Sequence, residues 1–227
     1  MQNLIAASVF FLLLHFGVSG TRLRDGLVAR LGDGPYRGLF SLASLLGLVW
    51  MIYAYHRAPT LPLWQAPAAL RPLAYALVFL GFLLVVIGLS TPSPTQAGGE
   101  ARLADGADPG RGIVRVTRHP FLWGVTLWAV VHVTMNGDLA SLILFGTLLL
   151  LALGGPLSID AKRQRLLGAQ WTRFAQGTSS LPFAAILSGR NSLYAAINEI
   201  GFVRPAVAIV VYALIFHFHG RFFGQPL

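Results

Sequence analysis

His15 is a polar side chain inside the apolar run 3–20, where an imidazole is costly unless it has a partner or a function. Ser8 lies seven residues before it and Ser19 lies four residues after it. At about 3.6 residues per turn, these three side chains share one face of a helix. A neutral imidazole is able to hydrogen-bond a neighbouring helix or to ligate a metal or a haem iron. The pattern therefore indicates a polar stripe on this helix, with one side chain, the imidazole of His15, that is able to take part in chemistry.

His132 repeats this pattern in a second apolar run, with Trp128 four residues before it and Asn136 four residues after it. Two histidines on facing helices are able to clamp a haem plane between them. The spacing leaves two interpretations open, because each histidine is equally able to hydrogen-bond a neighbouring helix. At 1.5 Å per residue, His15 lies about 10 Å and His132 about 20 Å from the cytoplasmic edge, so a shared haem or metal requires helix tilt.

The segment 118–120, Arg-His-Pro, begins the run that contains this second histidine. Proline is ordinary in the first turn of a helix, and arginine is ordinary at a cytoplasmic boundary. His119 is an alternative ligand, or it holds a phosphate or carboxylate, or it reaches the interface. His217 and His219 are two residues apart and point to opposite sides of a helix, which indicates interfacial anchoring, as does the position of His56.

The elements that carry these residues are long apolar runs. Hydrophobic residues make up 55% of the 227 residues and charged residues only 11%, against roughly 25% charged in soluble domains. Runs of about 20 apolar residues match the ~30 Å hydrocarbon core of a bilayer. We therefore predict an all-α, polytopic membrane helix bundle of about six transmembrane helices, at 2–20, 36–55, 70–90, 120–136, 139–158 and 202–219.

Charge and cysteine content exclude several classes of function. No basic soluble face is visible for a nucleic acid, and we interpret the net charge of +9 as arginines that flank spans and face anionic lipid. The sequence has no cysteine, which excludes disulfides, thiolate metal sites and covalent haem attachment. We expect the first run to be retained, because no clear cleavage site precedes Arg22 and Arg24.

Basic residues predict the orientation in the membrane. They concentrate in the first, third and fifth connections, whereas the second and fourth have few or none. By the positive-inside rule, the odd connections are cytoplasmic and both termini are non-cytoplasmic, in a bacterial inner membrane. The residues concerned are Arg22, Arg24, Arg30, Arg37, Arg102, Arg111, Arg115, Arg118, Lys162, Arg163, Arg165, Arg173 and Arg190.

We expect one membrane domain over 1–227 with two long connections. The segment 91–118 is rich in proline, glycine and charge, which predicts a polar cytoplasmic loop. The segment 159–200 is predicted to be amphipathic and interfacial, beginning as a helix over 159–174, and its residues 182–195 either enter the membrane or lie on it. The sequence Asn-Gly-Asp at 136–138 predicts a tight turn between the fourth and fifth spans.

The chain resembles the NnrU family of membrane proteins, and through it the 15-cis-ζ-carotene isomerases of plants and cyanobacteria. The resemblance extends over nearly the whole chain, in HFGVSGTRLRDGLVARLGDGPYRGLFSLASL, TRHPFLWGVTLWAVVH and DAKRQRLLGAQWTRFAQGTSSLPFAAILSGR. The last stretch is the most specific, because SLPFAAI followed by Gly-Arg is not a general membrane pattern.

This resemblance implies a non-covalent haem b ligated by histidines, and the matching positions are His15 and His132. It also implies a redox-dependent coordination site on the haem iron. A hydrophobic polyene substrate would bind there, and one of its cis double bonds would rotate without net oxidation. Arg118 and Arg190 are both expected near the cytoplasmic face, where they are able to pair with haem propionates. One departure is Ala129, because the related isomerases carry a cysteine one turn before the second histidine. A thiolate ligand switch is therefore excluded here.

Two other functions remain open. The family is also associated with denitrification and nitric-oxide metabolism, which a haem protein would suit. RHPFLWG followed by DAKRQRLLGAQWTRF is similar to the core of the isoprenylcysteine carboxyl methyltransferases, which bind S-adenosylmethionine; Arg118, His119, Asp160, Gly168, Trp171 and Phe174 would match. Only Asp160 stands where that family has a glutamate pair. A third interpretation is a non-catalytic membrane scaffold or sensor, and the oligomeric state is left open.

Overall fold

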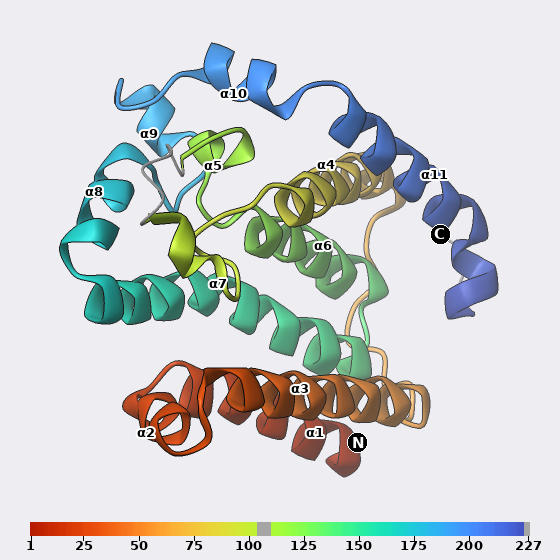
Figure 1. The fold of residues 1–227 in the computed structure, drawn as a ribbon. Helices are drawn as coiled ribbons and strands as arrows, with labels where there is room; N and C mark the ends of the chain where they lie inside the picture. Colours follow the sequence, from red (N-terminus) through yellow and green to blue (C-terminus); the bar gives the residue numbers. More distant parts are fainter. Residues whose placement is uncertain (104–109, 225–227) are drawn as a thin grey trace. The chain divides into compact units, whose positions relative to one another are not determined.

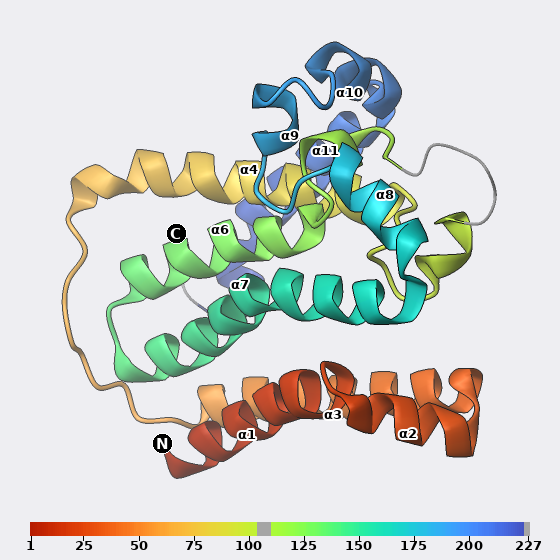
Figure 2. The ribbon, with the colours of Figure 1, turned by 90° about the vertical axis from the view of Figure 1, so that its left-hand side faces the viewer.

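The computed structural model describes residues 1–103 and 110–224. Within these residues the regular secondary structure is helical, and one isolated antiparallel bridge joins Pro62 to Asp138. The predicted all-α fold class is confirmed. The ribbon is drawn in Figures 1 and 2.

Within the described part of the chain, five helical segments are long and apolar enough to cross a membrane. They coincide with five predicted spans and run over Gln2–Ser19, Asp33–His56, Ala68–Ser90, Leu139–Leu167 and Val203–Phe223. The remaining predicted span, the fourth along the chain, is helix α6, Pro120–Asn136, whose 17 residues lie at the lower end of the spanning range. The chain is thus a multi-pass membrane protein, and the side that each terminus faces stays a prediction.

The chain divides into two compact units, each built from two stretches of sequence. The first unit contains Met1–Arg71 and Ala129–Lys162, and the second contains Pro72–Trp128 and Arg163–Leu227. His15 and His132 both belong to the first unit. Arg118, His119 and Arg190 belong to the second. That 1–227 forms one domain stays a prediction.

In the first unit, α1 (Gln2–Leu12) packs antiparallel to α3 (Asp33–His56), as Figures 1 and 2 show. The Phe10 and Trp50 rings lie 5.9 Å apart, and the Trp50 indole donates to the Asn3 amide oxygen at 3.0 Å. Helix α2 (Arg22–Leu31) lies in the predicted first connection between them. An aromatic contact and a side-chain hydrogen bond therefore join the two helices of the first hairpin.

The first helix continues past α1 as a π-helix, η1 (Leu13–Ser19). This segment packs closely on α7 (Leu139–Leu167), where Gly154 leaves room for the Phe16 ring. A Cβ added to Gly154 would lie 2.7 Å from that ring. One turn later, a Cβ added to Gly20 would lie 2.6 Å from the Ser158 hydroxyl. Small residues thus allow a close helix contact, as membrane helices commonly do.

The predicted turn between the fourth and fifth spans is confirmed, since α6 ends at Asn136 and α7 begins at Leu139. Gly137 has a φ of 68°, which favours glycine, and its carbonyl accepts from the Leu63 and Trp64 amides at 2.8 and 3.1 Å. The connection after α3 therefore crosses the α6–α7 turn and holds it in place.

In the second unit, α4 (Arg71–Ser90) packs antiparallel to α6 and is crossed obliquely by α11 (Val203–Phe223), as Figures 1 and 2 show. Gly81 faces α6 so closely that an added Cβ would lie 2.9 Å from the Gly124 carbonyl oxygen. On the other side, the Tyr212 ring lies 5.2 Å from the Phe79 ring. A glycine contact and an aromatic contact thus join these three helices.

Short helices of the second unit lie outside these spans and correct two expectations. The segment 91–118 is not simply a polar loop, because Ile113, Val114 and Val116 of its helix α5 are buried. Its residues 104–109 lie outside the described residues. The short elements are η3 (Gly99–Leu103), α5 (Ile113–Val116), α8 (Ala169–Gly177), α9 (Ala184–Leu187) and α10 (Leu193–Ile200).

The predicted amphipathic helix over 159–174 is wrong as a single element. Helix α7 continues to Leu167, and Gly168, with a φ of 52°, separates it from α8. Trp171 and Phe174 are buried against Val114 of α5, whereas Leu166 is exposed. The apolar positions of α8 therefore face protein, because α5 covers them.

Candidate functional site

His15 lies within the π-helix η1, a rare conformation that is frequently found at functional sites. Its carbonyl oxygen accepts from the Gly20 amide, five residues later, at 3.0 Å. The wider turn shifts the residues after it relative to a regular α-helix. The polar stripe of Ser8, His15 and Ser19 is therefore not a straight α-helical stripe.

The imidazole of His15 has a defined tautomer. Its Nδ1 lies 2.8 Å from the Phe11 carbonyl oxygen, which only accepts, so Nδ1 donates and Nε2 keeps its lone pair. The ring lies between aromatic rings, 4.4 Å from Phe11 and 5.3 Å from Phe40 of α3. A backbone carbonyl on one ring nitrogen is the usual support for a histidine that ligates a metal through the other.

His132 lies near the carboxyl end of α6, and its ring is 4.7 Å from the Phe145 ring of α7. The polar residue of its stripe, Asn136, donates to the Ser141 hydroxyl at 3.1 Å. That hydroxyl also lies 3.0 Å from the Tyr55 hydroxyl of α3. The polar face around His132 is thus a connected hydrogen-bond network that joins α6, α7 and α3.

The two histidines lie at different levels of the first unit. His15 contacts α3 at Phe40, whereas His132 reaches α3 through Phe145, whose ring lies 6.1 Å from that of Tyr55. Fifteen residues of α3 separate these levels, which is about 22 Å at 1.5 Å per residue. The donor chemistry of His15 fits a haem iron, but this arrangement does not place both imidazoles on one iron.

An open groove of about 470 Å³ runs along the first unit between α1 and α7. Its lining is apolar apart from Ser8 and Thr147, and the hydroxyl of Ser8 is buried without a hydrogen-bond partner. It extends from Val133, beside His132, to Leu12, which lies three residues before His15. The lining residues are Ile5, Ser8, Val9, Leu12, Val133, Leu142, Ile143, Gly146, Thr147, Leu149 and Leu150.

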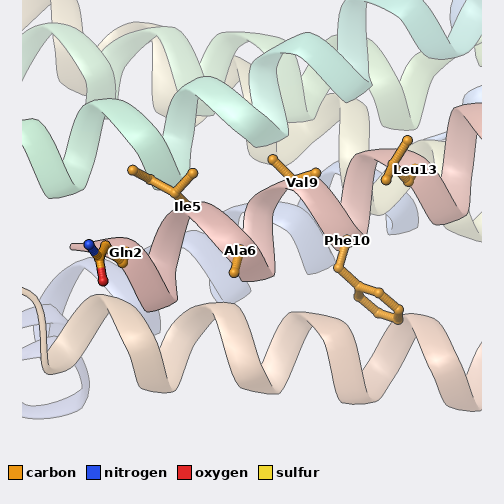
Figure 3. A pocket seen from close by; sticks show the side chains of 6 residues that line it. All are labelled: Gln2, Ile5, Ala6, Val9, Phe10 and Leu13. Carbon is orange, nitrogen blue, oxygen red and sulfur yellow. The ribbon is translucent and has the colours of Figure 1, made fainter.

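A second, shallower hollow of about 500 Å³ lies along α1 alone. Figure 3 shows Ile5, Val9 and Leu13 on one side of that helix and Phe10 on the side of α3. Ile5 and Val9 also line the α1–α7 groove, so the two hollows adjoin. The side of α1 that carries Ile5 and Val9 thus offers an apolar surface that is continuous with the groove.

Arg118 and His119 form a tightly held turn in the second unit. The amide of Arg118 donates to the Ser179 carbonyl at 2.9 Å, and its carbonyl accepts from the Thr95 hydroxyl at 2.7 Å. The guanidinium carbon of Arg118 lies 6.0 Å from the centre of the Trp171 ring. His119 is only 3% exposed. Arg118 and Trp171, both matched by the methyltransferase resemblance, are therefore in contact.

Arg190 holds a loop of its own unit together. Its guanidinium donates to the Gln176 and Thr178 carbonyl oxygens at 2.8 and 3.2 Å, and its Nε donates to the Ser188 hydroxyl at 2.8 Å. These bonds satisfy carbonyls at the carboxyl end of α8. Pairing of Arg118 and Arg190 with haem propionates stays a prediction.

Two acidic residues of the second unit escaped the sequence reasoning. Glu199 of α10 accepts from Arg115 through both carboxylate oxygens at 2.8 Å, and from the Gly112 amide at 2.6 Å. The Arg115 guanidinium lowers the pKa of Glu199 from 4.5 to about 2. Glu100 pairs with Arg163, which is only 3% exposed.

A signal for these pairs was present in the composition. The chain has only 8 acidic residues against 17 basic ones, so an acid in an apolar stretch such as 195–200 is conspicuous.

Within residues 1–103 and 110–224, no group of three or more histidine, cysteine, aspartate or glutamate side chains is placed to hold a metal ion.

Comparisons with known proteins identify a family and two similar proteins. The family model described as NnrU protein matches residues 3–227. The chain is 26% identical over 228 residues to the 15-cis-zeta-carotene isomerase, chloroplastic, of Zea mays, covering 99% of this chain and 60% of that protein. With the Arabidopsis thaliana protein of the same name it is 26% identical over 224 residues, covering 96% and 58%.

The chain thus spans about 60% of the length of these curated relatives. No solved structure matches it. The resemblance found in the sequence is confirmed at the level of the family.

Proposed function

This chain belongs to the NnrU protein family, and from that membership and the geometry of the first unit we propose that it is a haem-dependent membrane isomerase acting on a hydrophobic polyene. The names of the two relatives support isomerisation of a long polyene. Membrane-spanning helices suit a substrate that dissolves in lipid. We place the protein in a bacterial inner membrane, where the arginine pattern would set its orientation.

The α1–α7 groove is our proposed seat for the polyene. Its apolar lining matches a hydrocarbon chain, and its length along α7, from Leu142 to Leu150, is about 12 Å. A rod-like substrate would enter sideways from the bilayer, with Leu12 guiding one end toward η1. Burial of the chain would exclude water from the double bond that rotates.

His15 is the residue that would hold the haem. The observation that carries this proposal is its Nδ1 bond to the Phe11 carbonyl within a π-helix, which leaves Nε2 as a ligand. A bound haem b would supply a redox-active iron with a coordination site near the polyene. Phe11 and Phe40 would orient the imidazole, and His132 is the second candidate ligand.

An absorption spectrum of the protein, purified in detergent after expression with ample haem, tests this role. We expect a Soret band that His15→Ala abolishes. His56→Ala is the matched control, because it removes an exposed histidine at the end of α3. A colourless wild-type protein, or an unchanged band in His15→Ala, would reject haem ligation by His15.

The same spectra decide the role of His132. If both histidines ligate one iron, His132→Ala also loses the band, and the first unit must rearrange on haem binding, because the two histidines contact different levels of α3. If His132 serves only its network, His132→Ala keeps the band. Electron paramagnetic resonance separates the two, because two imidazole ligands give a low-spin ferric iron.

Conversion of a cis polyene in proteoliposomes, followed by chromatography of the isomers, tests the groove. A Cβ added at Gly146 meets nothing within 4 Å, so Gly146→Leu should fill open space in the groove and slow conversion while the Soret band is kept. Gly38→Leu, at an equally open position on α3 outside the groove, is the control. Equal rates in both variants would remove the groove from the proposal.

A nitric-oxide or denitrification role would use the same haem. Ferrous haem binds nitric oxide, so a spectral change with nitric oxide but no conversion of polyenes would favour that role. A scaffold or sensor without a cofactor would be colourless and inactive in both assays.

The contact between Arg118 and Trp171 favours a second candidate, a methyltransferase that uses S-adenosylmethionine. A guanidinium over an indole, beside a buried His119, is a polar site able to hold a carboxylate. Calorimetry with S-adenosylmethionine tests it. Binding that is lost in Arg118→Ala but kept in Arg173→Ala, an exposed arginine of α8, would support this activity, and absence of binding at millimolar ligand would remove it.

A further inference from the structure

We propose that the segment 181–202 of the second unit is a membrane-surface module, whose apolar face inserts into the interfacial layer of the bilayer beside α11. This face, called the α9–α10 face below, is made of large apolar side chains that are exposed although they lie outside the candidate spans. They are Leu181, Phe183, Leu187, Leu193, Tyr194, Ile197 and Phe202.

Helices α9 and α10 are one-sided, and α5 sets their orientation. Ile186, Ala196 and Ile200 pack into a core cluster with residues of α5. Leu187 and Tyr194 lie on the other side of these helices, away from the core cluster, and are 86% and 78% exposed. Each helix therefore buries its inner residues in protein and presents its outer residues to the surroundings.

Polar bonds keep α10 in this orientation. The Glu199 carboxylate is held by Arg115 of α5, and the Arg204 guanidinium donates to the Glu199 and Ile200 carbonyls at 3.2 and 3.0 Å. Arg204 lies in the first turn of α11, so it ties the end of α10 to the start of the next span. The α9–α10 face is thus rigidly presented.

The backbone conformation of Phe183 is consistent with a ring that points away from the protein, as part of the α9–α10 face. Phe183 has a φ of 65°, the one non-glycine residue with a positive φ among residues 1–103 and 110–224. Such a conformation is disfavoured for an aromatic residue and persists only where the surroundings impose it. Here the Phe183 amide donates to the Val116 carbonyl of α5 at 2.8 Å, while the ring remains exposed.

Connectivity identifies the partner as lipid. Helix α10 ends at Ile200 and α11, a candidate membrane span, begins at Val203, with Phe202, 83% exposed, between them. The eight residues of α10 are about 12 Å long, so all of it lies close to the point where the chain enters the bilayer. An apolar face at that depth meets acyl chains and headgroups, as interfacial amphipathic helices do.

This assignment refines the expectation for 159–200. Its first part, α8, has its apolar side chains covered by α5, so it needs no lipid. Its second part, α9 and α10, leaves its outer apolar side chains uncovered. The residues 182–195 therefore lie on the membrane surface and do not cross it, because α9 and α10 contain only 4 and 8 residues.

The cysteine-free sequence allows a direct test by site-directed spin labelling. Leu187→Cys, Tyr194→Cys and Ile197→Cys, each labelled with a nitroxide and reconstituted in phosphatidylcholine–phosphatidylglycerol vesicles (3:1), report depth through collision with oxygen and with a water-soluble nickel chelate. We expect all three labels to favour oxygen. Gln170→Cys, an exposed polar position on α8, is the control and should favour the nickel chelate.

Two results would overturn the proposal. Nickel accessibility at all three positions, equal to that of Gln170→Cys, would place the face in water. Low accessibility to both reagents, with dipolar broadening between labels, would instead show that a second copy of the chain covers it. Exposed positions tolerate the label, and a single peak in gel filtration verifies that each variant is folded before the measurement.

Discussion

The ion pair between Glu199 and Arg115 yields the most quantitative prediction. Glu199→Gln keeps the shape of the side chain and removes its charge. The fall in the pKa of Glu199 from 4.5 to about 2 corresponds to about 3 kcal/mol at about 1.4 kcal/mol per pKa unit. Because the carboxylate is partly open to solvent, which screens ion pairs, we expect about 1–2 kcal/mol at neutral pH.

The pH dependence follows from the direction of this change. The carboxylate has a lower pKa in the folded protein, so its stabilisation is fully present above about pH 4.5, the unfolded value. It is lost as the pH falls from there toward about 2. Wild-type α10 should therefore lose protection on acidification, and Glu199→Gln should lack this loss because the amide does not titrate.

Hydrogen exchange with mass spectrometry measures the opening of α10 locally, which avoids the need for reversible unfolding of a membrane protein. A change of 1–2 kcal/mol predicts about 5–30-fold faster exchange over residues 193–200 in Glu199→Gln at pH 7. The neighbouring exposed variant Asn198→Ala is the control. Equal exchange in wild type and Glu199→Gln, or an acid-induced loss of protection that persists in Glu199→Gln, would refute the reasoning.

Two further substitutions test the packing. Gly137→Ala should lower the melting temperature in detergent by several degrees, because Gly137 has a positive φ and an added Cβ would overlap the Trp64 carbonyl oxygen. Gly146→Ala, at a position inside helix α7 where the added Cβ meets no neighbour, should not lower it. Trp171→Ala removes a buried indole and should cost about 3–5 kcal/mol by chemical denaturation, whereas Leu166→Ala, at an exposed position, should stay within about 0.5 kcal/mol.

The spans were predictable because hydrocarbon thickness sets their length and apolar content. The turn at Gly137 was predictable because Asn-Gly-Asp interrupts two apolar runs. The end of α7 was not predictable from periodicity, because the charges after Ile159 suggested a new helix, whereas an α-helix continues through charged residues until a residue such as Gly168 breaks it. The burial of Trp171 depends on α5, a four-residue helix that no sequence window detects.

For the candidate site, the sequence indicates residue types but not their geometry. Hydropathy alone shows that His15 lies within the membrane, but it shows neither the π-helix around His15 nor the close packing of Phe16 on Gly154, which is distant in sequence. The expected joint role of His15 and His132 relied on facing helices and on a helix tilt that would bring the two histidines to one level. The level at which each histidine meets α3 is set by tertiary contacts with aromatic side chains. The spacing of residues along a single helix contains no information about those contacts.

The surroundings of the two histidines differ in a way that argues for unequal roles. Around His132, Asn136, Ser141 and Tyr55 are joined by hydrogen bonds, so that end of the first unit is stabilised by its polar groups. Along α1 and α3 near His15, the hydroxyls of Ser8 and Ser44 are buried without partners. Each such group costs about 1–3 kcal/mol.

A rare π-helix also carries His15. Costs of this kind persist where a ligand or a function compensates them. If a haem or a polyene supplies that compensation, ligand binding should slow hydrogen exchange in η1 and α1 more than in α6. Slower exchange confined to α6 would assign the compensating ligand to His132 instead.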